Sequence, residues 1–211
     1  MTEKEKVNFI LEQLNILYPD AKAELDFEND FELLVAVVLS AQTTDIQVNI
    51  VTKDLFLYYP TPEKMMNADI LHVESILNRI GLYRTKAKNV VNLSKMIVEN
   101  FDGKVPSNRK DLESLPGVGR KTANVVLSVA FNIPAIAVDT HVARVSKRLG
   151  LVLETDSVEV IEKKLMKMFP EETWTKLHHQ LILFGRYICT ARNPKTELCP
   201  FKLFCGCSNL F

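Results

Sequence analysis

The apolar positions of this chain recur at helical spacing from one end to the other. Phe9, Leu14 and Leu17 belong to the apolar stripe of a first predicted helix, which ends near residues 18–20. Residues 31–41 are nearly all apolar and do not alternate with polar ones, which predicts a helix buried on every side. The pattern therefore favours helices over strands as the elements of the core.

Further helical stretches are predicted, and clusters of turn-forming residues separate them. They cover residues 45–59, 69–80, 86–101, 121–131, 141–149, 158–169 and 172–187. The breaks contain glycine or proline and fall at residues 60–62, 81, 103–106, 116–119, 134 and 170. No segment predicts a strand hairpin, and there is no repeat. We expect an all-α fold of roughly ten short helices.

Composition agrees with an ordinary globular protein. The chain has 211 residues, of which 47% are hydrophobic and 25% charged, so it can form one large domain or two lobes. Charges occupy residues 1–7, where a signal peptide needs an apolar run. The longest apolar stretch, residues 33–41, is too short to span a membrane. We expect a soluble, cytoplasmic protein that binds no membrane.

The net charge is zero, with 26 basic and 26 acidic residues, whereas nucleic-acid-binding proteins usually carry a basic excess. The charges are not evenly spread, however. Residues 139–148 and 186–202 are rich in lysine and arginine, and the acids gather in residues 2–30 and 154–172. This distribution predicts a molecule with one basic face.

The most informative segment is residues 115–123, Leu-Pro-Gly-Val-Gly-Arg-Lys-Thr-Ala, where a Pro-Gly-x-Gly turn joins two predicted helices. Glycines free the backbone from Cβ clashes, so N–H groups here can approach a ligand. The unpaired amides and the macrodipole of a helix start favour an anion. A plain interhelical turn is the alternative. All nine residues resemble the helix-hairpin-helix motif of DNA-repair proteins. This resemblance favours a DNA phosphate bound by Gly117, Val118, Gly119 and Arg120.

Lys121 and Asp139 are the candidates for chemistry. Lys121 lies in the first turn of the second helix, where the helix dipole and partial burial in a groove both disfavour the ammonium form. An amine of this kind can act as a nucleophile; an electrostatic contact to phosphate is the alternative. Asp139 opens a predicted helix within residues 138–145, Val-Asp-Thr-His-Val-Ala-Arg-Val, where a plain N-cap is the alternative.

Together these segments resemble the endonuclease III family, within the helix-hairpin-helix superfamily of base-excision DNA glycosylases. The resemblance spans nearly the whole chain and includes residues 31–45, 81–88, 115–128, 137–150 and 179–187. It implies an all-α fold with two helical lobes flanking a DNA groove. One lobe is a six-helix block at residues 21–132, which contains the helix-hairpin-helix. The other joins residues 1–20 to residues 133–211 and ends in a cysteine loop.

The resemblance also implies an activity. The protein would be a bifunctional glycosylase and AP lyase acting on double-stranded DNA that contains oxidised pyrimidines or abasic sites. Lys121 would attack C1′ of a flipped nucleotide, form a Schiff base and nick the strand by β-elimination. Asp139, facing it across the groove, would assist deprotonation and stabilise positive charge on the sugar. We expect a monomer that associates with the nucleoid.

Further positions match the same family. Gln42 is expected to fill the gap left by the flipped base, and Leu82 to wedge into the base stack. A core leucine is the alternative for Leu82. The remaining matches are Ser40 and Asp45, expected to line the active site, and His141 and Arg144, expected to contact DNA. For His141 a helix-capping or groove-lining role is an equal alternative.

All four cysteines lie from residue 189 onward, and such crowding favours a metal site over disulfides. The family usually has four cysteines, separated by six, two and five residues, around a 4Fe–4S cluster. Cys189, Cys199 and Cys205 match the first, third and fourth places, but Thr196 stands in the second. An additional cysteine, Cys207, follows the last place.

Several interpretations of this tail are open. Cys207 replaces the missing cluster ligand, or the cluster is lost, or the cysteines bind zinc. Without a cluster, the loop at residues 192–202 is expected to be held by Phe201, Leu203 and Phe204.

Two other functions are compatible with the hairpin. A passive phosphate clamp needs neither an amine at position 121 nor an acid at position 139. A monofunctional glycosylase releases a base without cutting the strand. Covalent trapping of a Schiff base separates both of them from the bifunctional enzyme.

Overall fold

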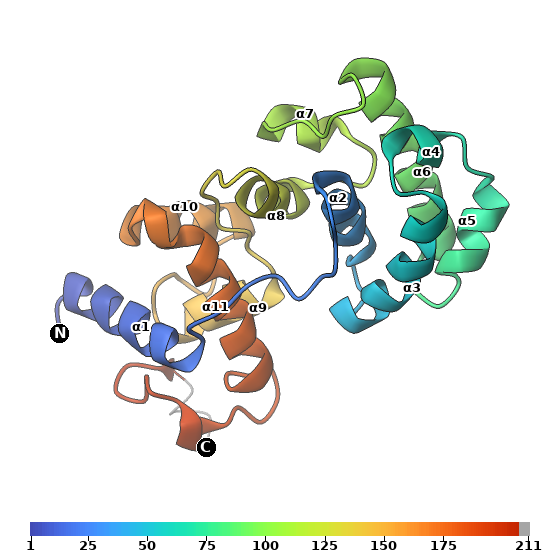
Figure 1. Cartoon of the computed structure of the whole chain (residues 1–211). Helices are drawn as coiled ribbons and strands as arrows, with labels where there is room; N and C mark the ends of the chain where they lie inside the picture. The colour runs from blue at the N-terminus through green and yellow to red at the C-terminus, as the bar shows by residue number, and fades with distance from the viewer. Residues whose placement is uncertain (207–211) are drawn as a thin grey trace. The chain divides into compact units, whose positions relative to one another are not determined.

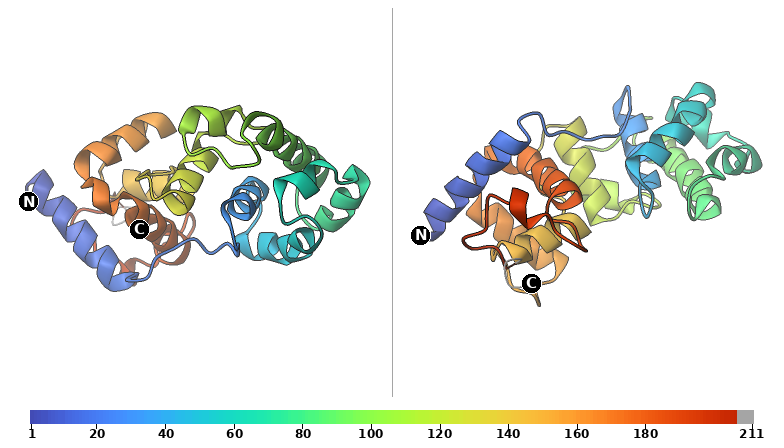
Figure 2. Two further views of the ribbon diagram at one scale, coloured as in Figure 1. Left: turned by 45° about the horizontal axis from the view of Figure 1, so that its top comes forward. Right: turned by 90° about the horizontal axis from the view of Figure 1, so that it is seen from below.

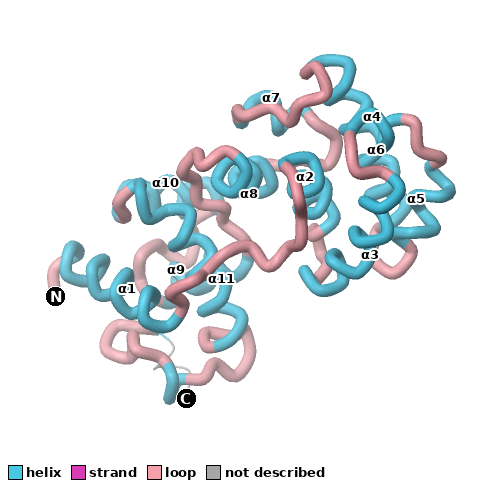
Figure 3. Tube along the Cα trace, in the orientation of Figure 1, coloured by secondary structure: helices cyan, strands magenta, loops and turns pink. Residues whose placement is uncertain are grey.

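The computed structural model describes residues 1–206, and every regular element within them is a helix (Figures 1 and 3). The all-α prediction is therefore confirmed. The chain divides into two compact units, one of Glu24–Ile133 and the other of Met1–Ala23 with the chain from Pro134 onward. Each unit has its own hydrophobic core. Within the described residues, no helix is long and apolar enough to cross a membrane.

The unit of Glu24–Ile133 is built around α2, Asp30–Leu39, of which nine of ten residues are buried. α2 packs against α3, α6 and α8, which confirms the prediction of a helix buried on every side. Helices α4 and α5 both pack against α6, and α3 packs against α5 (Figure 2). The helices after α2 are α3 (Asp45–Tyr58), α4 (Pro62–Met66), α5 (Ile70–Leu77), α6 (Tyr83–Asn100), α7 (Arg109–Ser114) and α8 (Arg120–Ala130).

Side-chain caps define where most of these helices begin. A polar side chain accepts a backbone N–H of the first turn at Asn29, Thr44, Thr61, Asp69 and Asn108. The prediction that residues 60–62 form only a break is wrong, because α4 begins at Pro62. Pro62 occupies the first turn of α4, where its missing N–H costs nothing and its fixed φ suits a helix.

The second unit contains α1 (Glu3–Leu17), α9 (Thr140–Arg148), α10 (Val158–Met168) and α11 (Trp174–Tyr187), with 3₁₀ turns at Glu171–Thr173 and Thr196–Leu198. Helix α11 packs against both α1 and α9. Gly185 permits the close approach of α9, because a Cβ there would lie 2.9 Å from the Cβ of His141. This packing fixes the start of α9, which carries Asp139.

Candidate functional site

The hairpin between α7 and α8 is shaped by Gly117. Its φ is +82°, a left-handed conformation that favours glycine. A Cβ at this position would lie 2.9 Å from Asn89 Nδ2 and 3.2 Å from Val38 Cγ1. Both the backbone conformation and the packing against α6 and α2 therefore require glycine here.

The start of α8 has no side-chain cap. Gly119 occupies the N-cap position, and the first bond of the helix runs from Ala123 N to Gly119 O at 2.9 Å. The amides of residues 120–122 precede that bond and have no acceptor within the helix. The side chain of Val118 is buried and so adds nothing to the surface, and its backbone N–H donates to Leu115 O at 3.1 Å. The start of α8 thus presents backbone N–H groups in the arrangement that binds anions.

Lys121 is the second residue of α8 and its side chain is exposed. The partial burial expected from the sequence is therefore absent in the chain alone. Among the described residues its ammonium has no hydrogen bond or ion pair. The amine of Lys121 is therefore accessible, within the described part of its own unit, to an external electrophile.

Asp139 is the N-cap of α9, and its Oδ1 accepts the N–H of Val142 at 2.8 Å. The capping role considered from the sequence is thus real. The other carboxylate oxygen makes no hydrogen bond to any residue that the structure describes. The cap orients the carboxylate through one oxygen and leaves the second available, so capping and chemistry are compatible.

Arg144 joins α9 to the end of α11. Its Nη2 donates to Gly185 O at 2.8 Å and its Nε to Cys189 O at 3.1 Å, so it caps carbonyls at the C-terminus of α11. Nη2 also lies 3.1 Å from Nδ1 of His141. These contacts give Arg144 a structural role, and its contact with DNA stays a prediction.

His141 is half-buried beside Arg144. Burial lowers its pKa from the ordinary value of 6.5; the carboxylate of Asp139 opposes this shift, and the charges of Arg144 and Arg186 reinforce it. A neutral imidazole that accepts from Arg144 at Nδ1 carries its proton on Nε2. A hydrogen bond with the Gly185 backbone also opposes the lowering of the His141 pKa, so the ring contacts both its own helix and the end of α11.

Gln42 and Leu82 share a feature that sequence reasoning missed. Both have left-handed backbones, with φ of 55° and 57°, and both side chains are exposed. Such a conformation in a bulky residue costs about 1–3 kcal/mol and clusters at functional sites. Leu82 is 59% exposed, so the alternative of a core leucine is wrong. The sequence does not predict this conformation at Gln42 and Leu82, because the residues that usually adopt it are glycine, asparagine and aspartate.

Three other polar residues lie near these positions in the chain. Ser40 ends α2, where its Oγ donates to Val37 O at 2.8 Å, and Asp45 is the first residue of α3. Lys86 of α6 was not singled out from the sequence, yet it is only 4% exposed. Its Nζ donates to Oγ1 of Thr43 at 2.7 Å, and burial lowers its pKa. Its place on the apolar stripe with Val90 was the available signal.

The cysteines of the last segment are buried close together. Cys199 shares a thiol hydrogen bond with Cys205, and this bond, together with burial, raises the pKa of Cys199. Thr196, at the second family position, begins a 3₁₀ turn. In residues 1–206 no three His, Cys, Asp or Glu side chains are arranged to hold a metal ion. Cys207 lies outside the described residues, so the thiols described here do not complete a four-thiolate site.

Aromatic packing holds this segment. Phe201 is fully buried, with its ring centroid 5.2 Å from that of Phe184 and 6.1 Å from that of Phe9, and Phe204 also packs on Phe9. The expectation for Phe201 and Phe204 is thus confirmed. The expectation for Leu203 is wrong, because this side chain is 94% exposed.

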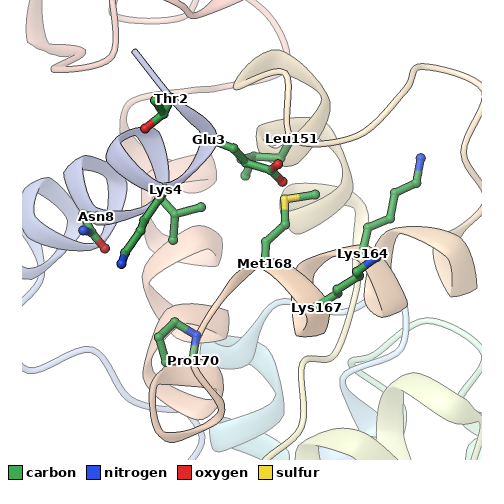
Figure 4. A pocket seen from close by; sticks show the side chains of 10 residues that line it. Thr2, Glu3, Lys4, Asn8, Leu151, Lys164, Lys167, Met168 and Pro170 are labelled. Carbon is green, nitrogen blue, oxygen red and sulfur yellow. The ribbon is translucent and has the colours of Figure 1, made fainter.

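A cavity of about 830 Å³ lies elsewhere in the same unit, between α1 and the end of α10 (Figure 4). Among the side chains that line it are Lys4, Lys167 and Met168. None of the residues expected to bind or react with DNA lines this cavity. It is therefore not the candidate site.

Comparisons with known proteins agree with the motifs. Residues 35–171 match the HhH-GPD superfamily base excision DNA repair protein model. Endonuclease III of Bacillus subtilis (strain 168) is 52% identical over 97% of this chain and 94% of the relative. Endonuclease III of Escherichia coli (strain K12) is 45% identical over 93% of this chain and 92% of the relative. A solved trapped covalent intermediate of endonuclease III with DNA superposes with a TM-score of 0.95 at 49% identity, covering 100% of both chains.

Proposed function

The chain belongs to the endonuclease III family of the HhH-GPD superfamily of base excision DNA repair proteins, and we propose that it is a bifunctional DNA glycosylase and AP lyase. Its substrate is double-stranded DNA containing oxidised pyrimidines or abasic sites, on which it acts as a monomer in the cytoplasm, at the nucleoid. The observation that carries the proposal is the exposed amine of Lys121 at the uncapped start of α8. A related enzyme trapped covalently on DNA supports it.

The start of α8 binds a phosphate of the strand under repair. The start of α8, whose N-cap Gly119 provides no side-chain cap, and the helix dipole supply a favourable site for the anion. The contact involves backbone only, so it positions the DNA without reading its sequence. Gln42 and Leu82, both exposed, enter the base stack when the damaged nucleotide is flipped out.

Lys121 Nζ, in its neutral form, attacks C1′ of the flipped nucleotide. The bond from C1′ to the base breaks, and the base leaves with the bonding electrons and takes a proton. The new C1′–N group loses a proton, the C1′–O4′ bond breaks with its electrons on O4′, which takes up a proton, and the nitrogen forms the C1′=N Schiff base of the opened sugar. Removal of a C2′ proton then breaks the C3′–O bond, which nicks the strand. Asp139, with one oxygen in the cap and the other available, is the carboxylate that assists proton removal and stabilises positive charge on the sugar.

Borohydride trapping tests this assignment. A duplex with an abasic site or thymine glycol is incubated with the protein and sodium borohydride, which reduces a Schiff base to a stable adduct. Wild type is expected to give an adduct and Lys121→Ala none. Lys95→Ala is the matched control, because Lys95 is an exposed lysine of the same unit whose partner in the described part of the chain is Glu99 on its own helix; it should trap like wild type.

The alternatives give different results. Trapping that survives in Lys121→Ala would overturn the nucleophile assignment. Release of a damaged base by wild type without any adduct would establish a monofunctional glycosylase. Tight duplex binding with neither base release nor an adduct would establish a passive phosphate clamp.

We further propose that a 4Fe–4S cluster, expected of this family, is held by Cys189, Cys199, Cys205 and Cys207, with Cys207 in the place of Thr196. The three buried thiols of the described residues support this donor set in part. A cluster bound there would stabilise the loop after α11 through folding linkage, and no step at Lys121 passes through it.

Absorption spectra and iron analysis test this part separately. Wild type is expected to show a broad band at roughly 400 nm, and Cys207→Ser to lose it. The double variant Thr196→Cys, Cys207→Ser restores the usual family spacing and should regain the band. Colourless wild type containing neither iron nor zinc would show that the site is lost.

A further inference from the structure

Among the exposed left-handed residues of the unit Glu24–Ile133, Asp102 and Asn132 are of types that favour this conformation, whereas Gln42 and Leu82 are not. Gln42 lies in the connection between α2 and α3, and Leu82 is the N-cap of α6; their φ angles are 55° and 57°. Neither residue type favours this region, and a conformation of this kind persists only where the surroundings enforce it. The structure must therefore contain contacts that hold both positions.

Lys86 contacts both segments. Its backbone N–H donates to Leu82 O at 3.0 Å, which is the first hydrogen bond of α6. Its side-chain Nζ donates to Oγ1 of Thr43, the residue after Gln42, at 2.7 Å. Thr43 in turn closes the turn around Gln42, because its N–H donates to Ser40 O at 3.1 Å.

The environment of Lys86 differs from that of an ordinary surface lysine, whose ammonium is solvated by water. The residue is 4% exposed, and lysine is rarely buried this far unless it is paired. No carboxylate pairs with it among the described residues, and Thr43 Oγ1 is the acceptor that the structure shows. Burying an ammonium for one hydroxyl contact is unfavourable for folding alone. Sites that break a local rule in this way are commonly functional.

We infer that Lys86 is a positioning residue that locks Gln42 and Leu82 in the conformations with which they enter the base stack. The inference rests on the proposed function, since it assigns a role in extruding the damaged nucleotide. Lys86 itself does not touch the reacting atoms. Its loss should therefore slow extrusion of a paired, damaged base more than the chemistry of a preformed abasic site, which unstacks at lower cost.

The test compares two variants that break the contact with two that keep it. Lys86→Met removes the ammonium and retains the length of the side chain. Thr43→Val removes the acceptor and retains the shape of threonine. Thr43→Ser keeps the hydroxyl, and Lys95→Met makes the same lysine change at an exposed position of α6. Single-turnover rates are measured on a thymine glycol duplex and on a duplex with a preformed abasic site.

Lys86→Met and Thr43→Val are expected to slow thymine glycol release by about 10- to 100-fold, the scale of a small misplacement of positioning groups. Nicking of the abasic duplex should fall by less than about threefold, because its extrusion is easier. Thr43→Ser and Lys95→Met should stay close to wild type. The fluorescence of a 2-aminopurine base next to the lesion should rise on binding wild type and rise less with the two breaking variants.

Other outcomes would overturn the inference. Wild-type rates on both substrates in folded Thr43→Val would show that the contact positions nothing. Equal slowing on both substrates, with no rescue by Thr43→Ser, would indicate general loss of structure. Thr43→Val decides the matter if Lys86→Met fails to fold. Failure of wild type itself to form a borohydride adduct would instead refute the proposed function.

Discussion

Two helix starts carry the proposed chemistry, and they are built in opposite ways. α8 begins at Gly119 without a side-chain cap, so its first amides have no partner within the helix. α9 begins at Asp139, whose carboxylate accepts the N–H of Val142. In the first case an external group must satisfy the helix start. In the second the helix start holds a catalytic candidate in place.

The difference shows how one local device serves two purposes. A helix start without a side-chain cap makes the fold slightly less stable, and its backbone N–H donors are available to a phosphate. A capped start gains that stability and orients a carboxylate, of which one oxygen stays available. A cap added to α8 should therefore raise stability and weaken DNA binding, whereas an uncharged cap at the start of α9 should keep the stability and lose the activity.

The largest effect is expected at Asp139. Asparagine caps a helix about as well as aspartate, so Asp139→Asn should change the free energy of unfolding by less than about 0.5 kcal/mol. It lacks the basic oxygen, and the single-turnover rate on thymine glycol duplex should fall by about 100-fold or more. Asp139→Ala should lose the same activity and about 1 kcal/mol of stability in addition. Wild-type activity in Asp139→Asn would show that Asp139 caps α9 and has no role in the chemistry.

The next effect concerns the turn that precedes α8. Gly117→Ala places a Cβ on a left-handed backbone and against Asn89 and Val38. We expect a loss of about 2 kcal/mol in the free energy of unfolding, measured by urea denaturation. Gly81→Ala is the matched control, because a Cβ there meets nothing within 4 Å. Similar stability of the two variants would mean that the turn is not constrained as described.

A smaller effect is expected from giving α8 a cap like that of α9. Gly119 has an extended backbone, with φ of −100°, and a Cβ there meets nothing within 4 Å, so a side chain fits. Gly119→Asp should raise the free energy of unfolding by a few tenths of a kcal/mol and weaken binding to an abasic-site duplex by about tenfold, since its carboxylate competes with the phosphate. The uncharged Gly119→Ser should weaken binding less. Unchanged affinity in both variants would show that the start of α8 does not bind a DNA phosphate.

The sequence predicted the architecture well where periodicity carries the information. The all-apolar stretch became α2, buried on nearly every residue, and the predicted helix at residues 158–169 became Val158–Met168. The hairpin with Lys121 was identifiable because glycine and proline announce a turn by type. Helix α4 was missed because Pro62 looks the same whether it ends one helix or starts another.

What the sequence did not reveal depends on tertiary contacts. The left-handed backbones of Gln42 and Leu82 carry no signature in residue type. Lys86 is buried with its ammonium bonded to Thr43, which is distant in the chain. Leu203 was expected to pack because it is apolar, yet it is exposed, whereas Phe201 is fully buried. Hydrophobicity alone does not decide which of several adjacent apolar residues points inward.

The smallest effect concerns His141, in the first turn of the capped helix. Its pKa is lowered from 6.5 mainly by burial, so the unfolded chain takes up this proton at a higher pH than the folded chain. Its contribution to stability is therefore fully present above pH 6.5 and is lost as the pH falls through the lowered folded value. Urea midpoints between about pH 7.5 and about pH 5 should fall less steeply in His141→Gln than in wild type. Because Asp139 opposes the shift, Asp139→Asn should make the decline steeper; an unchanged slope in that variant would show that the cap and the imidazole are not electrostatically coupled.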